Sequence, residues 1–262
     1  MKKNLPLFFL LFTTFFLSCS KEDSPKTKWK VSGIIGKYIN DPTDSVYNKF
    51  DYSIKNEIKI YSSTASGLSG VVVYHFDDQN RISRIQHSYS SNIPGYDVGY
   101  TYLNKKVRVI QTSFTGTQHP VVDSAILYIG DNGLATRSVY YSFSKNNTID
   151  SSSVSYVWND HDLVSIRTND VTPLRETKFY YDNSYNPFYI TDLPISFDLN
   201  FSGSLFYACN KHNCISIKSS EDTYILKTES RDYNSDNFLS QIVSERAWTQ
   251  GKFESRLDLI PQ

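Results

Sequence analysis

A short unit recurs along most of this chain, and its period limits the architectures that the chain can adopt. The clearest copy is Tyr74–Ile85, in which a stretch ending in aromatics leads through Asp, Asn and other turn-forming residues into a second apolar stretch. The last apolar residue before each turn of the successive copies is Phe76, Tyr102, Ile129, Trp158, Tyr181 and Tyr233. The steps between them are 26, 27, 29, 23 and 52 residues, so a degenerate copy is expected in the double step, at residues 205–217. Such a repeat predicts serial copies of one supersecondary unit.

Each copy has the chemistry of a β-hairpin. Asp and Asn side chains cap neighbouring backbone groups and tolerate positive φ, and Asp131-Asn132-Gly133 is the plainest signal of this kind. In the strands, Tyr96, Val98, Tyr100 and Tyr102 alternate with more polar residues and therefore share one face. Residues 238–248 also fit a helical stripe, but the repeat places a returning strand there. The 20 tyrosines suit pleated, half-buried surfaces.

These patterns predict an all-β protein with little helix. Its serial antiparallel hairpins are expected to form one large curved sheet or an open, barrel-like sheet, and residues 29–262 are expected to be a single domain. A membrane-spanning barrel is the alternative, because Tyr-rich alternating strands are also typical of that class. The amino-terminal signal described next, and a carboxyl end of Leu259-Ile260-Pro261-Gln262 without a terminal aromatic, favour a soluble sheet tethered by lipid.

The amino terminus has the pattern of an export signal. Lys2 and Lys3 precede an apolar run, Leu5–Leu17, which is shorter than the ~20 residues needed to span a bilayer. The sequence Phe16-Leu17-Ser18-Cys19 resembles the lipobox of bacterial lipoproteins, with Phe in place of the usual Leu. This resemblance implies that residues 1–18 are a signal peptide and that Cys19 carries lipid. The alternative is an incidental Cys19 and a cleavage site elsewhere.

Residues 19–28 are expected to be a flexible tether. Within them, Lys21-Glu22-Asp23 resembles the signal that sends Bacteroidetes lipoproteins to the outer face of the outer membrane, with a periplasmic position as the alternative. Loss of Lys2 and Lys3 reduces the basic residues from 27 to 25 against 27 acidic ones, so the mature chain is slightly acidic. This balance argues against nucleic acid as a partner, because phosphate binding needs a concentrated positive surface.

Two family resemblances accompany the repeat. Tyr74–Ile85 resembles the YD repeat, Tyr-x-Tyr-Asp-x-x-Gly-Arg-Leu-x-x-Ile, with Phe76, Asn80 and Ile82 as departures. In large YD-repeat proteins such hairpins wind into a hollow shell, and six or seven copies are too few for that. The signal, the hairpins, Tyr185-Asn186-Pro187-Phe188 and Asn210-Lys211-His212-Asn213 together resemble uncharacterised Bacteroidetes outer-membrane lipoproteins. That resemblance implies a large curling sheet, export and anchoring, and no activity.

Two clusters have metal-binding alternatives. Cys209 and Cys214 predict a local disulfide in an oxidising compartment, whereas Cys209, His212 and Cys214 as metal ligands would lack a fourth donor. Asn159-Asp160-His161-Asp162 has the oxygen donors for calcium but occupies the turn of a repeat, where Asp and Asn are expected anyway. We therefore expect no metal site and no cofactor.

The sequence contains no recognisable catalytic motif, and we expect a non-enzymatic protein. The histidines, His75, His87, His119, His161 and His212, are expected to be exposed strand or turn residues. Aromatic side chains on a solvated sheet face bind sugars or protein partners; the candidates are Tyr140, Tyr141, Trp158, Tyr180, Tyr181 and Tyr189. The leading hypothesis is a lipid-anchored envelope protein that binds a glycan or a protein. The alternatives are a structural or adhesive envelope protein and, third, a glycan hydrolase with two converging carboxylates.

Overall fold

The computed structural model describes residues 29–39, 45–64, 67, 69–89, 94–114, 121–143, 149–169, 175–186, 211–219, 224–246 and 252–261. The predicted signal and tether, His119, Tyr189 and Cys209 lie outside these ranges. The described residues form sixteen β-strands: β1 (Trp29–Tyr38), β2 (Ser45–Asp51), β3 (Glu57–Thr64), β4 (Ser69–Phe76), β5 (Ile82–Tyr89), β6 (Pro94–Leu103), β7 (Lys106–Ser113), β8 (Val121–Ile129), β9 (Ala135–Phe143), β10 (Ile149–Asn159), β11 (Asp162–Thr168), β12 (Arg175–Tyr185), β13 (His212–Lys218), β14 (Tyr224–Tyr233), β15 (Leu239–Arg246) and β16 (Lys252–Pro261).

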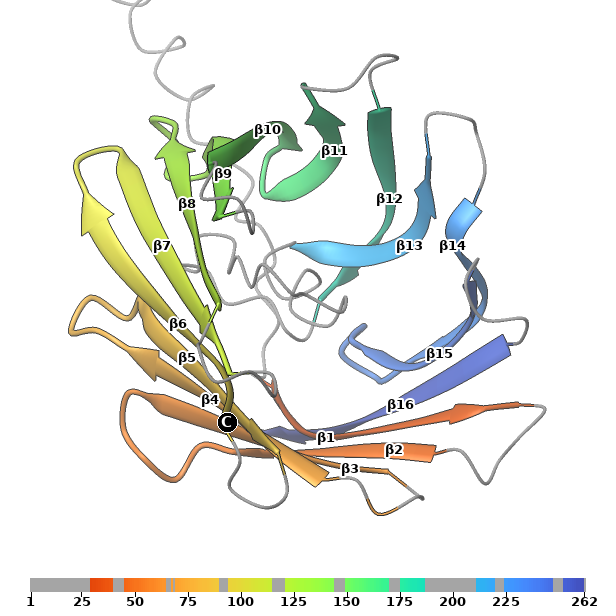
Figure 1. The fold of residues 1–262 in the computed structure, drawn as a ribbon. Coiled ribbons are helices and arrows are strands. Elements are labelled where there is room, and N and C mark those ends of the chain that lie inside the picture. Colours follow the sequence, from red (N-terminus) through yellow and green to blue (C-terminus); the bar gives the residue numbers. More distant parts are fainter. Residues whose placement is uncertain are drawn as a thin grey trace, which may run out of the picture.

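The strands form one closed antiparallel barrel in which each strand pairs with its neighbours in sequence (Figure 1). The ring closes where β1 pairs with β16, from Trp29 opposite Pro261 to Tyr38 opposite Phe253. Gly36 lies against the ring of Phe253 at this seam, and a side chain there would displace that ring. The predicted all-β class is confirmed, and the sheet that was expected to stay open is closed.

Tight turns gather at one end of the barrel, which we call the turn end. Six turn residues there have positive φ: Asn56, Asn80, Lys105, Gly133, Asp160 and Asn237. Neighbouring turns also contact each other, since the backbone N–H of Phe76 donates to the carbonyl oxygen of Asn56 at 2.9 Å. Both β1 and β16 have their outer termini, Trp29 and Pro261, at this same end. The opposite end, which we call the loop end, carries the other connections.

The acidic residue of the repeat acts as a cap for its turn. Asp77 Oδ1 accepts the backbone N–H groups of Gln79 and Arg81 at 3.0 and 2.9 Å, and Oδ2 accepts Arg81 Nε at 2.8 Å. Asn234 repeats this arrangement with the N–H groups two and four residues further on. Burial alone would raise the pKa of Asp77, but the hydrogen bonds from Arg81 and Gln79 lower it below its ordinary value. The turn chemistry expected for Asp and Asn is thereby confirmed.

The aromatic residue at the end of a repeat strand bonds to the preceding hairpin. Three hydroxyl groups donate to backbone carbonyl oxygens at 2.8 Å, and an indole N–H does so at 2.7 Å: Tyr52 to Val31, Tyr102 to Ile82, Tyr181 to Leu163 and Trp158 to Ala135. In three of these pairs the acceptor residue directly precedes the extra residue of a β-bulge in its own strand. Burial raises the pKa of Tyr52 to about 12, so the phenol stays protonated and keeps donating. At these four positions the aromatic side chain thus links one hairpin to the strand before it.

The repeat departs from its predicted form in three places. Tyr181-Asp182, expected to enter a turn, lies inside β12, which continues to Tyr185. The prediction was wrong there because turn-forming side chains are also used to cap an irregular strand end, as Asp182 does for the N–H of Ser184 at 2.9 Å. A further hairpin, β2 and β3, precedes the first recognised copy. In the degenerate copy, β13 starts at His212, and residues 205–210 are outside the described ranges. Residues 239–246, for which a helical stripe was the alternative, form β15, the returning strand that the repeat predicted.

Candidate functional site

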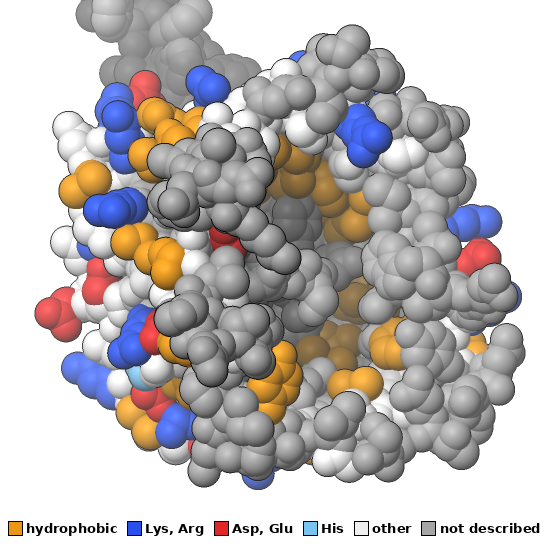
Figure 2. All heavy atoms as spheres, viewed as in Figure 1, with side chains coloured by type: hydrophobic (Ala, Val, Ile, Leu, Met, Phe, Trp, Pro, Cys, Tyr) orange, Lys and Arg blue, Asp and Glu red, His pale blue; other side chains and the backbone are white. Residues whose placement is uncertain are grey.

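The inner wall of the barrel is apolar and aromatic. Its buried members include Ile85, Val98, Val109 and Leu127, all 0% exposed, together with Tyr74, Tyr100, Tyr156 and Phe179. Ile58, Tyr102, Trp158 and Ile217 pack against this cluster. Figure 2 shows the molecule hollowed at its centre, with hydrophobic side chains inside the hollow. Sixteen strands form a barrel too wide for its wall side chains alone to fill. The residues that are 0% exposed are covered by other atoms of the protein, so the partly buried members of this wall are the ones that can face the hollow, which we call the lumen.

The lumen changes polarity along its axis. Strand β7 alternates strictly, with Val107 and Val109 on the inner face near the turn end, then Gln111 and Ser113 on the same face toward the loop end. Gln111 is 0% exposed and its Nε2 donates to Ser113 Oγ at 3.1 Å. Asp123 pairs with Gln111 across the sheet and so faces the same way. The inner wall is therefore apolar toward the turn end and more polar toward the loop end.

Charged and apolar side chains share the outer wall, where Tyr47, Tyr61, Val122 and Tyr180 are 41–42% exposed. Cross-strand ion pairs lie there, among them Arg84 with Asp97, Arg167 Nε with Glu176 Oε1 at 2.9 Å, and Lys37 Nζ with Glu254 Oε2 at 3.3 Å. Charged side chains are visible on the outer rim in Figure 2. A barrel that spans a bilayer has an apolar outer band around a polar interior, whereas both walls of this barrel are mixed, with the larger apolar cluster inside. No helix among the described residues is long and apolar enough to cross a membrane.

A hydroxyl network lies on the inner wall at β9 and β10. Ser138 Oγ and the Tyr156 hydroxyl are 2.7 Å apart, and the hydroxyls of Tyr156 and Tyr140 are 3.3 Å apart. Burial raises the pKa of both phenols. These groups are therefore neutral donors and acceptors that bond to one another within the inner wall.

The structure divides the predicted aromatic binding residues between the two walls. Tyr140, Trp158 and Tyr181 pack against the inner cluster. Tyr141 and Tyr180, their neighbours in the chain, face the outer wall, where Tyr180 is 42% exposed with Lys218 Nζ 5.9 Å from its ring centroid. The sequence argument that adjacent tyrosines face opposite ways is confirmed. Tyr189 is not among the described residues, and ligand binding by this set stays a prediction.

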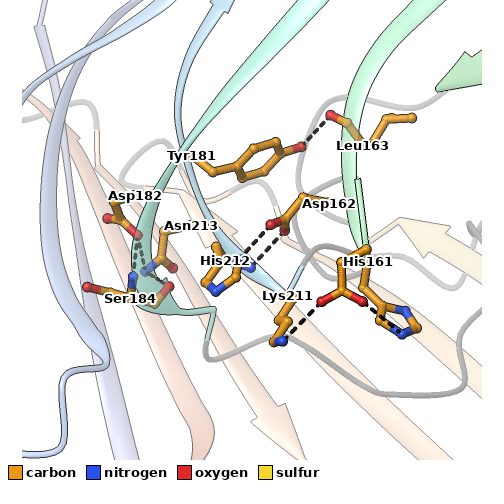
Figure 3. Close-up of polar contacts among 10 residues, drawn as sticks. His161, Asp162, Leu163, Tyr181, Asp182, Ser184, Lys211, His212 and Asn213 are labelled. Carbon is orange, nitrogen blue, oxygen red and sulfur yellow. Dashed lines mark hydrogen bonds and ion pairs between the residues drawn. The ribbon is translucent and has the colours of Figure 1, made fainter. Parts of the chain in front are cut away.

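A cluster of polar side chains lies at the turn end, beside β11 and β13 (Figure 3). Asp162 Oδ1 accepts the backbone N–H of His212 at 2.9 Å, and Oδ2 lies 2.6 Å from His212 Nδ1. Lys211 Nζ donates to Asp160 Oδ2 at 3.1 Å, and this hydrogen bond lowers the pKa of Asp160. These contacts attach the start of β13 to the turn between β10 and β11, so the cluster has a structural explanation.

Asp182 is the centre of a second part of this cluster, on β12. Its side chain is 11% exposed and accepts Ser184 N–H, Arg231 Nη1 at 3.1 Å and the hydroxyl of Tyr233. Asn213 Nδ2 donates to the carbonyl oxygen of Ser184 at 3.1 Å. The carboxylate thus connects β12 to β14, two strands away in the barrel.

Several predictions about single residues need correction or stay open. The four described histidines are half-buried instead of exposed, because their rings lie against other side chains, as that of His87 does against Tyr96. Among the described residues no three His, Cys, Asp or Glu side chains are arranged to hold a metal ion. Cys214 is a buried free thiol whose pKa burial raises to about 12. Cys209 is outside the described residues, so their pairing stays a prediction.

The inner polar positions were missed by sequence reasoning. Gln111, Ser113 and Asp123 fall on the apolar-face register of their strands, and this break in alternation is the signal that could have identified them. The Asp162–His212 contact joins residues that are 50 positions apart, and the local patterns contain no sign of it.

No protein-family model and no curated protein matches this sequence. Among solved structures, the chain is similar to a porin-like protein from Bacteroides vulgatus, with 10% identity, a TM-score of 0.44, and coverage of 87% of this chain and 98% of that one. It is also similar to a porin-like protein from Bacteroides uniformis, with 8% identity, a TM-score of 0.37, and coverage of 88% and 98%. At these values neither similarity assigns a function to this chain.

Proposed function

We propose that this protein is an outer-membrane lipoprotein and a non-enzymatic binding module, which takes the apolar part of an amphiphilic molecule into its lumen. The observation that carries the proposal is the orientation of the sheet, with its main apolar and aromatic cluster inside and its cross-strand ion pairs outside. A wide barrel with an apolar inner wall favours an apolar occupant, because burial contributes about 25 cal/mol per Å² of apolar surface. The polar groups near the loop end suit the headgroup of such a molecule.

The polar clusters of the described residues support binding over catalysis. The Asp162–His212 pair and the Asp182 contacts are each accounted for by strand ends and turns that they hold together. A glycan or protein ligand on the outer wall is the second candidate, and the exposed ring of Tyr180 favours it. A structural or adhesive role would need neither surface.

Lumen binding can be tested with a fluorescent fatty-acid probe and a matched pair of substitutions on β12. Thr177 pairs with Ile166 of the inner wall, whereas Lys178 pairs with Ser165 and faces outward. We expect saturable binding that unlabelled fatty acid displaces. Thr177→Trp should weaken it at least about tenfold by filling the lumen, whereas Lys178→Trp should leave it unchanged. Absence of saturable binding, or equal loss in both variants, would contradict the proposal, and a positive glycan array lost on Tyr180→Ala would support the second candidate.

The anchor is tested by Cys19→Ala. If Cys19 carries the lipid, this variant should disappear from the lipoprotein fraction of the outer membrane, and metabolic labelling with a fatty acid should be lost. The physical reason is that membrane attachment then depends on the acyl chains, each buried CH₂ contributing about 0.8 kcal/mol. A variant that stays in the outer membrane with its label would show that the lipobox interpretation is wrong.

Exposure on the cell surface is part of the same proposal and rests on Lys21-Glu22-Asp23 behind Cys19. An antibody to the barrel should label intact cells, and substitution of these three residues by Ala should reduce that labelling while leaving total protein unchanged. Labelling only after permeabilisation of wild-type cells would favour the periplasmic alternative.

A further inference from the structure

One sector of the outer wall differs in charge from the rest. Cross-strand pairing places Lys106, Tyr128 and Arg137 in one row across β7, β8 and β9, and Arg108, Ile126 and Val139 in the next row. A third row contains Ile110, Ser124 and Tyr141, and Val122 lies beyond it with 41% exposure. We call these rows the basic face. Directly paired residues lie on the same side of a sheet, so three cations and six apolar or aromatic side chains share this surface.

The cations of the basic face are not balanced by acids. Among the described residues, the outward positions of β7, β8 and β9 carry no Asp or Glu, and none of the described ion pairs involves Lys106, Arg108 or Arg137. Other cations of the outer wall are paired, among them Arg84 with Asp97 and Arg167 with Glu176. All three cations of the basic face are exposed, and Lys106 Nζ lies 5.2 Å from the centroid of the Tyr128 ring.

We infer that the basic face docks on the anionic headgroups of the membrane to which the protein is tethered, an inference that rests on the proposed lipid anchor. Cations beside aliphatic and aromatic side chains suit the boundary between charged headgroups and acyl chains. The geometry allows the contact. Sixteen tilted strands form a barrel about 30 Å across, and the ten residues of the tether reach about 35 Å when extended. The barrel can therefore lie on this side wall while Cys19 stays in the bilayer.

The test uses the acylated mature protein reconstituted in vesicles of phosphatidylcholine, alone or mixed with phosphatidylglycerol. Reaction of lysines with an amine reagent is measured by peptide mass spectrometry, with Lys178 on the outer face of β12 as the internal control. We expect the labelling of Lys106 relative to Lys178 to fall in the anionic vesicles and to recover at high salt. Each cation strengthens docking by about fivefold, so the double variant R108Q/R137Q should weaken it about 25-fold and restore the labelling.

Equal Lys106 labelling in the two kinds of vesicle would overturn the inference, as would protection that salt and R108Q/R137Q leave unchanged. Protection that appears only when envelope proteins are added would assign the basic face to a protein partner instead. Flotation separates this outcome from failure of the anchor: an anchored protein floats with both kinds of vesicle, whatever its orientation. A protein that floats with neither would contradict the anchor and the docking together.

Discussion

Leu127→Lys should unfold the barrel, whereas Ile126→Lys should leave it folded. Leu127 is 0% exposed on the inner wall of β8, and its immediate neighbour Ile126 faces outward, opposite Arg108. A lysine at position 127 would bury an ammonium group among apolar side chains without a counter-ion. The effective penalty for such a charge is several kcal/mol, so we expect a loss of at least about 3 kcal/mol in the free energy of unfolding. The outward lysine should change it by about 0.5 kcal/mol or less.

Urea denaturation of the two variants, followed by tyrosine fluorescence and far-UV circular dichroism, measures this difference. These two variants also distinguish a barrel with an apolar inner wall from a barrel that spans a bilayer. In a barrel that spans a bilayer, an outward lysine at the membrane midplane costs about 2–4 kcal/mol, while inward substitutions are tolerated. A less stable Ile126→Lys and a near-native Leu127→Lys would therefore show that the outer wall faces lipid and would refute the orientation on which the proposed function rests.

Asp182→Ala should be the most damaging change at the turn end. It leaves Arg231, the hydroxyl of Tyr233 and the N–H of Ser184 without their carboxylate. Unpaired partly buried donors cost about 1–3 kcal/mol each, and partial rehydration reduces the sum, so we expect a loss of about 3 kcal/mol in the free energy of unfolding. Asp131→Ala is the matched control, because the Asp131 side chain is 91% exposed and its ion pair with Lys105 lies in solvent. Asp131→Ala should therefore have a negligible effect on the free energy of unfolding.

Thermal denaturation of both variants gives the comparison, and Asp182→Asn adds a second test. Asparagine keeps an oxygen for the Ser184 N–H but loses the charge that faces Arg231, so its stability should lie between those of the alanine variant and the wild type. If Asp182→Ala and Asp131→Ala prove equally mild, the contacts of Asp182 do not hold β12 to β14.

Much of the fold could be predicted because its causes are local. Asp77 caps the N–H groups two and four residues ahead of it, and Asn80 takes positive φ, so the turn depends on a few adjacent side chains. Alternation along Tyr96–Tyr102 likewise needs only the two-residue period of a strand. Where local chemistry serves another purpose, as with Asp182 inside β12, the same reasoning placed a turn that is not there.

The candidate site was harder to predict, because it depends on contacts between distant residues. The sequence by itself determined the all-β class, the hairpin turns and the division of each strand into an apolar and a polar side. Only the tertiary structure decided which side is concave, since this follows from pairing of β1 with β16, between residues such as Gly36 and Ser255. Closure turned the more apolar side of the sheet into the inner wall and the side that carries the ion pairs into the outer surface. The physical reason is that a strand pattern specifies two faces, whereas the curvature that encloses one of them belongs to the whole sheet.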